Sequence, residues 1–268
     1  MDFDFTDDQL SLRDAVARWV ERAHGFERRH ALAKAGGASR ATYAELAELG
    51  LTGLAVPEAQ GGMGFGPVEA MVVMEELGRG LVSAPYAQGA LIAPAMLALG
   101  MATGGQSGTD AAACADWLSR IAEGSALVVL AHQERGLRYA LDRCSTTATA
   151  STASSNGPAW ALTGRKSVVP AGDEADAFIV PALLDGRPAL FLVERDAAGS
   201  SITGYPTQDG ARAADLVLNA TPARLITRQA LAALELAMDI GIAAQAAEAV
   251  GLMDRLGATT AEYLHTRK

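Results

Sequence analysis

The sequence contains few of the residues that build disulfide frameworks and metal centres. Its 268 residues include two cysteines, Cys114 and Cys144, with no CxxC spacing. This usage is typical of a reducing compartment and argues against a disulfide framework. The four histidines show no spacing typical of metal ligands, and around His24 and His30 we expect a helix end exposed to solvent rather than a metal site.

Long apolar runs and basic stripes are also absent from the sequence. No run of about 18 uninterrupted apolar residues occurs, and the first residues, MDFDFTDD, are acidic where a signal peptide is basic. We therefore expect a soluble cytoplasmic protein with no membrane partner. The net charge of -9 comes without a basic stripe, so there is no electrostatic reason to expect nucleic-acid binding.

The first 124 residues are expected to form an all-α domain. Apolar residues make up 50% of the chain, which is enough for a substantial core in one large domain or two smaller ones. Thr6 and Gln9 have the spacing of a capping box, so the first amphipathic helix is expected to begin near Asp7. Further helices are expected at residues 39–49, 67–78, 85–100 and 110–123.

After Ser125 the pattern changes to short apolar runs separated by turn residues. The runs read ALVVLA, AWALTG, AFIVPALL, ALFLVE and ADLVLN, and they predict an antiparallel, β-barrel-like middle domain. Residues 145–155 are rich in Ser, Thr and Ala, and there a strand is favoured slightly over a flexible loop. From Thr227 a helical pattern without proline continues to Lys268, which predicts one helix of about 40 residues.

The predicted fold class is α+β, with an N-terminal helical domain at residues 1–124, a β domain at 125–222 and the start of an incomplete C-terminal helical domain at 223–268. Within the long helix, Gly241, Gly251 and Gly257 each cost about 1 kcal/mol relative to Ala unless another element packs closely on them. We expect packing partners from the helical domain, from another chain or from residues beyond Lys268. The apolar residues that need such partners are Leu231, Leu234, Met238, Ile242, Val250, Met253 and Leu264.

Residues 45–80 read ELAELGLTGLAVPEAQGGMGFGPVEAMVVMEELGRG, two amphipathic helical stretches joined by a Pro/Gly loop. This segment resembles the N-terminal domain of the acyl-CoA dehydrogenases. Further similar segments follow in order at residues 117–134, 162–180, 189–199 and 248–268. Within the family, the sequences AHQE and GYPTQDG resemble the small-subunit type of pimeloyl-CoA dehydrogenase.

The resemblance implies an FAD flavoprotein built from a helical domain, a β domain and a C-terminal helical bundle, with this chain ending inside the first helix of the bundle. The implied reaction is α,β-dehydrogenation of an acyl-CoA thioester, in which a carboxylate removes the α-proton while the β-hydride passes to the flavin. The implied partners are an acyl-CoA substrate and a second subunit, in a homodimer or in a heteromer with another acyl-CoA dehydrogenase chain.

The resemblance also indicates which residues of the β domain would contact FAD. The family carries a Thr-Glu-Pro-x-x-Gly-Ser-Asp segment, and residues 133–140 stand in its place with Gln133 replacing the threonine. Leu130 and His132 would keep backbone contacts, which do not depend on the side chain. For Arg138 two readings stay open, a phosphate contact or a solvated or salt-bridged residue, and the second is favoured.

A second flavin segment of the family, Trp-Ile-Thr-Asn, is replaced by Val168, Val169, Pro170 and Ala171. Pro170 offers neither a hydroxyl nor a backbone N–H, so Val168 would hold the flavin edge by apolar contact; alternatively, Val168 and Val169 are core strand residues. Arg267 matches the arginine of the family's Thr-Arg-Lys-Gln-Phe-Gly segment, which reaches the FAD pyrophosphate of a neighbouring subunit. The alternative is a frayed and solvated terminal residue.

No residue is expected to act as the catalytic base. In most of the family the base lies in the C-terminal bundle, and in the isovaleryl type it lies on the present helix, at the position that Gly241 occupies. Asp239 and Glu235 are close in sequence, but two residues turn a helix by about 200°, so Asp239 points elsewhere. Three readings remain: an FAD-dependent dehydrogenase subunit or truncated form, a non-catalytic structural subunit of a heteromeric dehydrogenase, and an inactive remnant.

Overall fold

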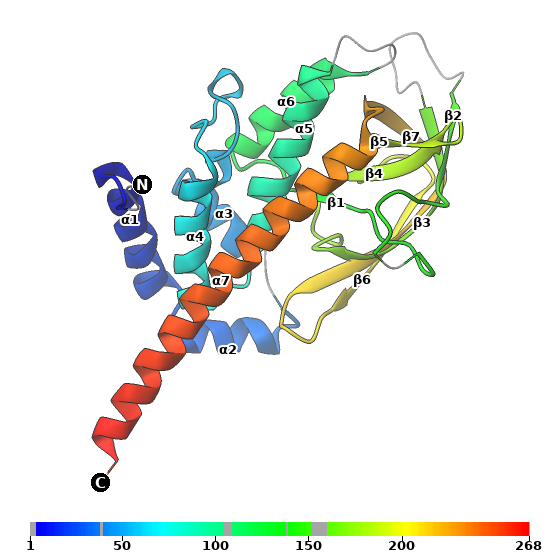
Figure 1. Cartoon of the computed structure of the whole chain (residues 1–268). Helices are drawn as coiled ribbons and strands as arrows, with labels where there is room; N and C mark the ends of the chain where they lie inside the picture. The colour runs from blue at the N-terminus through cyan, green and yellow to red at the C-terminus, as the bar shows by residue number, and fades with distance from the viewer. Residues whose placement is uncertain (1–3, 38–39, 104–108, 138, 152–159, 268) are drawn as a thin grey trace.

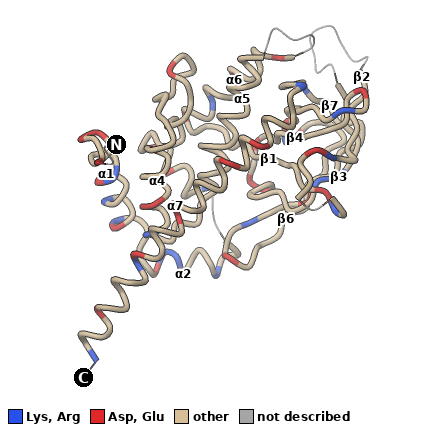
Figure 2. The backbone as a smooth tube through the Cα atoms, viewed as in Figure 1, with Lys and Arg blue, Asp and Glu red and all other residues tan. Residues whose placement is uncertain are grey.

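The computed structural model describes residues 4–37, 40–103, 109–137, 139–151 and 160–267. A group of helices lies beside a barrel of strands, and one long helix, α7 (Ala230–Thr266), runs diagonally across the helices (Figure 1). The order of elements is the predicted one, because helices precede the strands and α7 follows them. The division into domains at residues 124 and 222 stays a prediction. Lys and Arg positions are scattered among Asp and Glu (Figure 2).

The helical part begins with the predicted capping box. The Gln9 N–H donates to Thr6 Oγ1 at 3.3 Å, and the Thr6 N–H donates to Gln9 Oε1 at 3.0 Å. The α-helices before the barrel are α1 (Asp7–Ala23), α2 (Phe26–Lys34), α3 (Arg40–Glu48), α4 (Pro67–Arg79), α5 (Ala93–Ala102) and α6 (Ala111–Ala122). Two 3₁₀ turns, η1 (Leu51–Gly53) and η2 (Glu58–Gln60), connect α3 to α4. The sequence did not predict α2.

The predicted helix at residues 85–100 is interrupted by a π-helical turn, η3 (Ala87–Ile92), which leads into α5. Pro94 lies near the start of α5 and has no N–H to donate to the carbonyl four residues earlier. The wider π spacing next to it accommodates the missing hydrogen bond.

His24 is buried, which contradicts the expectation of a solvated helix end. Its side chain is only 3% exposed and stacks against Trp19 with ring centroids 6.2 Å apart. The unexpected helix α2 explains the difference: it begins only two residues later, so His24 lies in the turn between two helices and beside the end of α4 rather than at a free helix end.

The strands form one seven-stranded sheet. They are β1 (Val128–Leu130), β2 (Thr147–Ala150), β3 (Trp160–Pro170), β4 (Ala177–Leu184), β5 (Arg187–Glu194), β6 (Ser200–Pro206) and β7 (Arg212–Thr227). The strand favoured within residues 145–155 is present as β2. Strand β6 was not predicted, since SSITGYP lacks an alternating apolar pattern, and β7 extends past residue 222.

The pairing order closes the sheet into a barrel. Strands β4, β2, β3, β7 and β5 are neighbours in that order, and β5 pairs again with β4. Most pairs are antiparallel as predicted, but β1 and β2 both run parallel to β4. Parallel neighbours need a long connection rather than a hairpin, so the local turn pattern of the sequence did not reveal them.

Helix α7 is held against α4 by a backbone crossing between two glycines. A Cβ on Gly251 would lie 1.8 Å from the Glu75 carbonyl oxygen, and a Cβ on Gly78 would lie 2.1 Å from the Glu248 carbonyl oxygen. Arg79 adds an ion pair to Asp254 at 2.8 Å beside this crossing. The expectation of close packing is therefore met at Gly251.

The other expected partners of α7 are present only in part. Leu234 is buried, whereas every residue from Met253 to Arg267 is exposed. No atom of the described residues lies within 4 Å of a Cβ placed on Gly257. By length and composition α7 could also cross a membrane, a property that it shares with core helices of soluble proteins.

The two glycines allow a matched test of the crossing. We expect Gly251→Ala to lower the free energy of unfolding by about 2 kcal/mol or more, because its methyl group must push α4 and α7 apart. Gly257→Ala should leave it unchanged or raise it by up to about 1 kcal/mol, since Ala favours a helix and has free space there. Urea unfolding followed by circular dichroism measures both, and equal stabilities would contradict the crossing.

Candidate functional site

Five of the six predicted cofactor residues line one cavity. Leu130, His132, Gln133, Val168 and Pro170 face a space of ≈ 50 Å³. Residues of the helical elements complete the wall, namely Gln88 and Ile92 of η3 and Met238 of α7. We call this space the β1–β3 cavity.

A break in β3 directs Val168 toward this cavity. The register of β3 against β7 shifts between Lys166 and Val169, and Val168 has a φ of 52°. A left-handed backbone is costly for a β-branched residue and persists only where its surroundings enforce it. Val168 is consequently 49% exposed whereas Val169 is 1% exposed, so only Val169 is a core strand residue.

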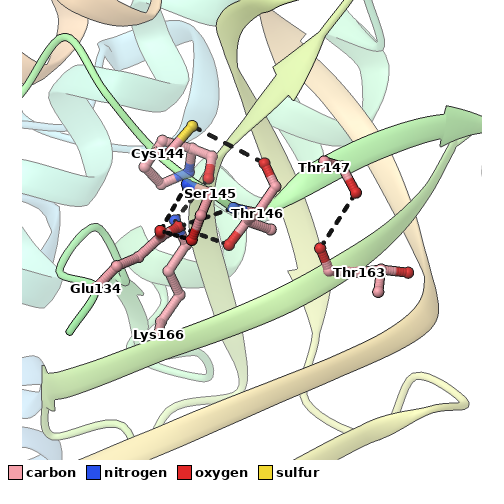
Figure 3. Close-up of polar contacts among 8 residues, drawn as sticks. Glu134, Cys144, Ser145, Thr146, Thr147, Thr163 and Lys166 are labelled. Carbon is pink, nitrogen blue, oxygen red and sulfur yellow. Dashed lines mark hydrogen bonds and ion pairs between the residues drawn. The ribbon is translucent and has the colours of Figure 1, made fainter. Parts of the chain in front are cut away.

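A buried ion pair holds the two segments of the cavity together. Lys166 Nζ lies 2.6 Å from Glu134 Oε1 and also donates to the Pro181 carbonyl at 2.7 Å. The side chains are 0% and 3% exposed. Both Ser145 and Thr146 donate backbone and hydroxyl hydrogen bonds to the Glu134 carboxylate (Figure 3).

These contacts fix the charge of Glu134. Burial alone would raise the pKa of the carboxyl, but the hydrogen bonds from Lys166, Ser145 and Thr146 outweigh burial and lower the pKa to about 2. Burial and the Lys166 ammonium lower the pKa of His132. Glu134 is therefore ionised and His132 neutral at pH 7.

The ion pair was missed in the sequence, because the burial of Lys166 is not visible there. In the structure its neighbours Ser167 and Val169 are also buried, and a buried Lys requires a partner. The pair also aligns the main chain, because the Ser167 N–H donates to the Gln133 carbonyl at 2.9 Å. The segments at residues 130–134 and 166–170 are thus joined beside the cavity.

Arg267 does not reach the β1–β3 cavity. It lies at the exposed end of α7, where Nη1 donates to the Tyr263 hydroxyl at 3.1 Å. Its guanidinium also lies 5.8 Å from the Tyr263 ring centroid. Arg138 falls outside the residues that the structure describes.

A larger cavity of ≈ 390 Å³ adjoins the first and shares Gln88 and Pro170 with it. Gln245 and Glu248 of α7 line this second cavity, as does Asp209. Burial raises the pKa of Glu248, and the nearby Asp209 charge acts in the same direction. We call this space the α7 cavity.

The candidate bases lie elsewhere. Asp239 lines an apolar groove of ≈ 890 Å³ between α4 and α7, and Glu235 is exposed. Gly241 approaches Ile92, whose Cδ1 lies 3.6 Å from a Cβ placed on the glycine. Among the described residues, none that lines the β1–β3 cavity carries a carboxylate.

The residues of the β1–β3 cavity fit one face of a flavin. Leu130, Val168 and Pro170 supply an apolar wall, and His132 and Gln133 add polar groups. The tricyclic flavin ring is larger than ≈ 50 Å³, so it would lie against this wall rather than inside it. The Val168 N–H is already directed at Asp215 Oδ1 at 3.4 Å.

Comparison with known proteins identifies relatives of the chain. Residues 6–125 match the model of the acyl-CoA dehydrogenase N-terminal domain. The acyl-CoA dehydrogenase FadE12 of Mycobacterium tuberculosis is 30% identical over 210 residues, 74% of this chain and 49% of the relative. FadE27 of the same organism is 28% identical over 232 residues, 85% of this chain and 57% of the relative. The chain thus spans about half the length of these curated relatives.

Among solved structures, the ChsE4-ChsE5 complex from Mycobacterium tuberculosis superposes with a TM-score of 0.80 and 27% identity, covering 100% of this chain and 69% of the other. Fold and comparisons together define a protein with the helix, barrel and helix arrangement of the acyl-CoA dehydrogenases. The chain belongs to the acyl-CoA dehydrogenase family. The similarity to the pimeloyl-CoA type stays a prediction.

The buried ion pair can be tested by removing one charge. We expect Glu134→Gln to lower the free energy of unfolding at pH 7 by about 3–5 kcal/mol, because Lys166 is left as an unpaired buried charge. The matched control is Glu194→Gln, at an exposed strand end, which should change it by less than about 0.5 kcal/mol. Urea unfolding of both variants measures the difference.

The Glu134→Gln variant should also change how the free energy of unfolding depends on pH under acidic conditions. The pKa of Glu134 is lower in the folded chain than in the unfolded chain, so its contribution is complete above the ordinary carboxyl pKa and disappears as the pH falls toward about 2. Between about pH 5 and pH 2 the stability of Glu134→Gln should therefore fall less steeply than that of the original protein. Parallel curves would contradict this assignment.

Proposed function

We propose that the chain is part of an FAD-dependent acyl-CoA dehydrogenase that forms the α,β double bond of an acyl-CoA thioester. The observation that supports this best is the convergence of Leu130, His132, Gln133, Val168 and Pro170 on one wall beside α7. When bound, FAD would accept the hydride from the β-carbon. An oxidoreductase reaction of this kind is typical of the family.

In this proposal the acyl group occupies the α7 cavity. A molecule there would lie next to a flavin bound at the β1–β3 cavity, since Gln88 and Pro170 line both spaces. Its lining is partly polar, through Gln245, Glu248 and Asp209. The buried surfaces of η3 and α7 would exclude water from the reacting carbons.

Each wall residue would have a limited task. Val168 and Leu130 would orient the ring by apolar contact, and Pro170 cannot donate to it because proline has no N–H. Gln133 can donate or accept through its amide, and neutral His132 can do either through its ring nitrogens. The Glu134–Lys166 pair would act indirectly, by keeping both wall segments in place.

The proposed reaction also needs a base that removes the α-proton, and the candidate residues of this chain are poorly placed for that role. Asp239 and Glu235 lie away from the β1–β3 cavity. Glu248 lies two helical turns beyond Gly241 and accepts a hydrogen bond from Gln245 at 2.9 Å. We propose that the base comes from outside the described residues, and that cytoplasmic association with a second chain completes the site.

The main alternative is a structural subunit without catalysis. The apolar groove between α4 and α7 favours this reading, because it leaves Leu236, Val250 and Met71 partly exposed. Exposed apolar grooves of this kind mark interaction surfaces on soluble proteins. The related ChsE4-ChsE5 structure is itself a complex of two named chains. We propose an apolar helix of a second dehydrogenase chain, or of a second copy, as its occupant.

Activity measurements distinguish an enzyme from a subunit. We expect the purified chain, saturated with FAD, to show no turnover of short, medium or dicarboxylic acyl-CoAs with an artificial electron acceptor. A positioned base contributes at least about 10²-fold in rate, and none of the described residues that line the β1–β3 cavity carries a carboxylate. The flavin absorption spectrum, recorded after removal of free FAD, measures cofactor binding separately.

The amide variants locate a base if turnover is found. Turnover that disappears in Glu235→Gln, Asp239→Asn or Glu248→Gln would show that this chain supplies its own base. Retained flavin without turnover would support a subunit of a larger enzyme. A chain that retains no flavin and gains none with a partner would favour the structural alternative.

The proposal also predicts that the chain associates with itself. Sedimentation should show a dimer or larger species at micromolar concentration, since an isolated α7 leaves Ile242, Met253 and Leu256 exposed. Met253→Glu should weaken association by about fivefold or more, because it places a charge on the exposed apolar surface of α7. The control Leu10→Glu places the same charge on α1 and should have no effect. A monodisperse monomer would refute the proposal.

A further inference from the structure

A third cavity lies where α1 ends, α2 begins and α4 ends beside α7. It has a volume of ≈ 270 Å³, and His24, Gly25, Arg29 and Arg255 are among its lining residues. None of these residues belongs to the β1–β3 cavity or the α7 cavity. We call it the α2 cavity.

The α2 cavity contains a buried imidazole whose hydrogen bonding is incomplete. His24 is 3% exposed, and within the described part of the chain neither ring nitrogen has a hydrogen-bond partner of good geometry. Burial and the charges of Arg28 and Arg29 lower its pKa, whereas the backbone of Leu81 and the carboxylate of Glu45 favour the protonated ring. An unsatisfied buried polar group is costly, so a ligand that hydrogen-bonds to the ring would be stabilising.

The N-terminus of α2 opens on the same space. Its N-cap, Gly25, has no side chain to cap the helix, and both Gly25 and Phe26 line the cavity. The first N–H groups of a helix lack intrahelical partners and carry the positive end of the helix dipole. Such an end favours an anion.

Two arginines, Arg29 and Arg255, give the cavity positive charge, and neither forms an ion pair with another described residue. Arg29 donates through Nη1 to the Gly80 carbonyl at 3.4 Å, while its buried Nε has no partner. Arg255 is exposed at the opening. Figure 2 shows basic positions where α2 lies close to α7.

The acidic residues of the cavity oppose an anion only in part. Glu76 is held by Arg79 at 3.2 Å and lies 3.8 Å from Arg13, and burial raises its pKa. Arg79 is also shared with Glu75 and Asp254. Glu21 is exposed at the rim. The groups free to meet a ligand are therefore His24, Arg29, Arg255 and the α2 N-terminus.

We propose that the α2 cavity binds a phosphate group, held by His24, Arg29, Arg255 and the first N–H groups of α2. A tetrahedral oxyanion offers acceptors to all of these donors at once, and guanidinium groups bind phosphate by paired hydrogen bonds. The phosphate is either free or carried on a nucleotide. This site does not depend on flavin binding or on dehydrogenase activity.

The experiment follows the ring of His24 in protein labelled with ¹⁵N-histidine. Inorganic phosphate and adenosine 3′,5′-bisphosphate are titrated separately, each against chloride at equal ionic strength. We expect saturable shifts of the His24 ring signals with phosphate. If the bisphosphate saturates at a lower concentration, the phosphate is bound as part of a nucleotide; if phosphate saturates first, the site takes the free anion.

Variants decide whether the shifts report this cavity. Arg255→Gln, which changes an exposed side chain and should fold normally, is expected to weaken binding by about fivefold, and Arg29→Gln by at least as much. The control Arg18→Gln removes one charge from an exposed position of α1 outside the cavity and should leave affinity within about twofold. Absence of a His24 shift beyond that in chloride, or equal weakening in all three variants, would overturn the proposal.

Discussion

The close approach of α4 and α7 is the constraint on which the other sites depend. Gly78 and Gly251 let the two backbones touch, and no side chain could occupy either position without moving a helix. Residues of α7 then line the β1–β3 cavity, the α7 cavity and the apolar groove. A small change in the angle of this one helix would alter all three spaces together, because each has α7 as a wall.

The barrel contributes a second, electrostatic constraint. Lys166 and Glu134 are both buried, so each charge needs the other as well as the neutral donors and acceptors around it. Their position is close to the left-handed residue Val168. The hydrogen bonds of the ion pair stabilise a segment whose backbone is locally strained, and they thereby allow Val168 to leave the strand and face the cavity.

Periodicity was sufficient to predict the sequence of helices, strands and final helix, because those patterns are local. It failed where the cause was not local. Helix α2 is short and has no buried residue, β6 is mostly exposed, and the parallel neighbours of β4 are distant in sequence. The resemblance to a family located five cavity residues but could not reveal the Glu134–Lys166 pair, which requires knowing that both side chains are buried.

Arg267 illustrates a different limit. Its assigned role involves a neighbouring subunit, so the single chain offers no partner of that kind and its guanidinium turns back to Tyr263. The same limit applies to a base. A residue that acts across an interface can be proposed from similarity, but its geometry is defined only in the assembled protein.

The uneven burial of α7 has a consequence for its dynamics. The helix is anchored from Ala230 to Gly251, whereas residues 253–267 are exposed. A helical segment of about 15 residues is marginal in water without tertiary contacts. The free energy of local opening should therefore decrease along the helix from the crossing outward. Amide hydrogen exchange in the last four turns would then become slower when a partner binds, because contacts with the partner would stabilise the helical conformation of this segment.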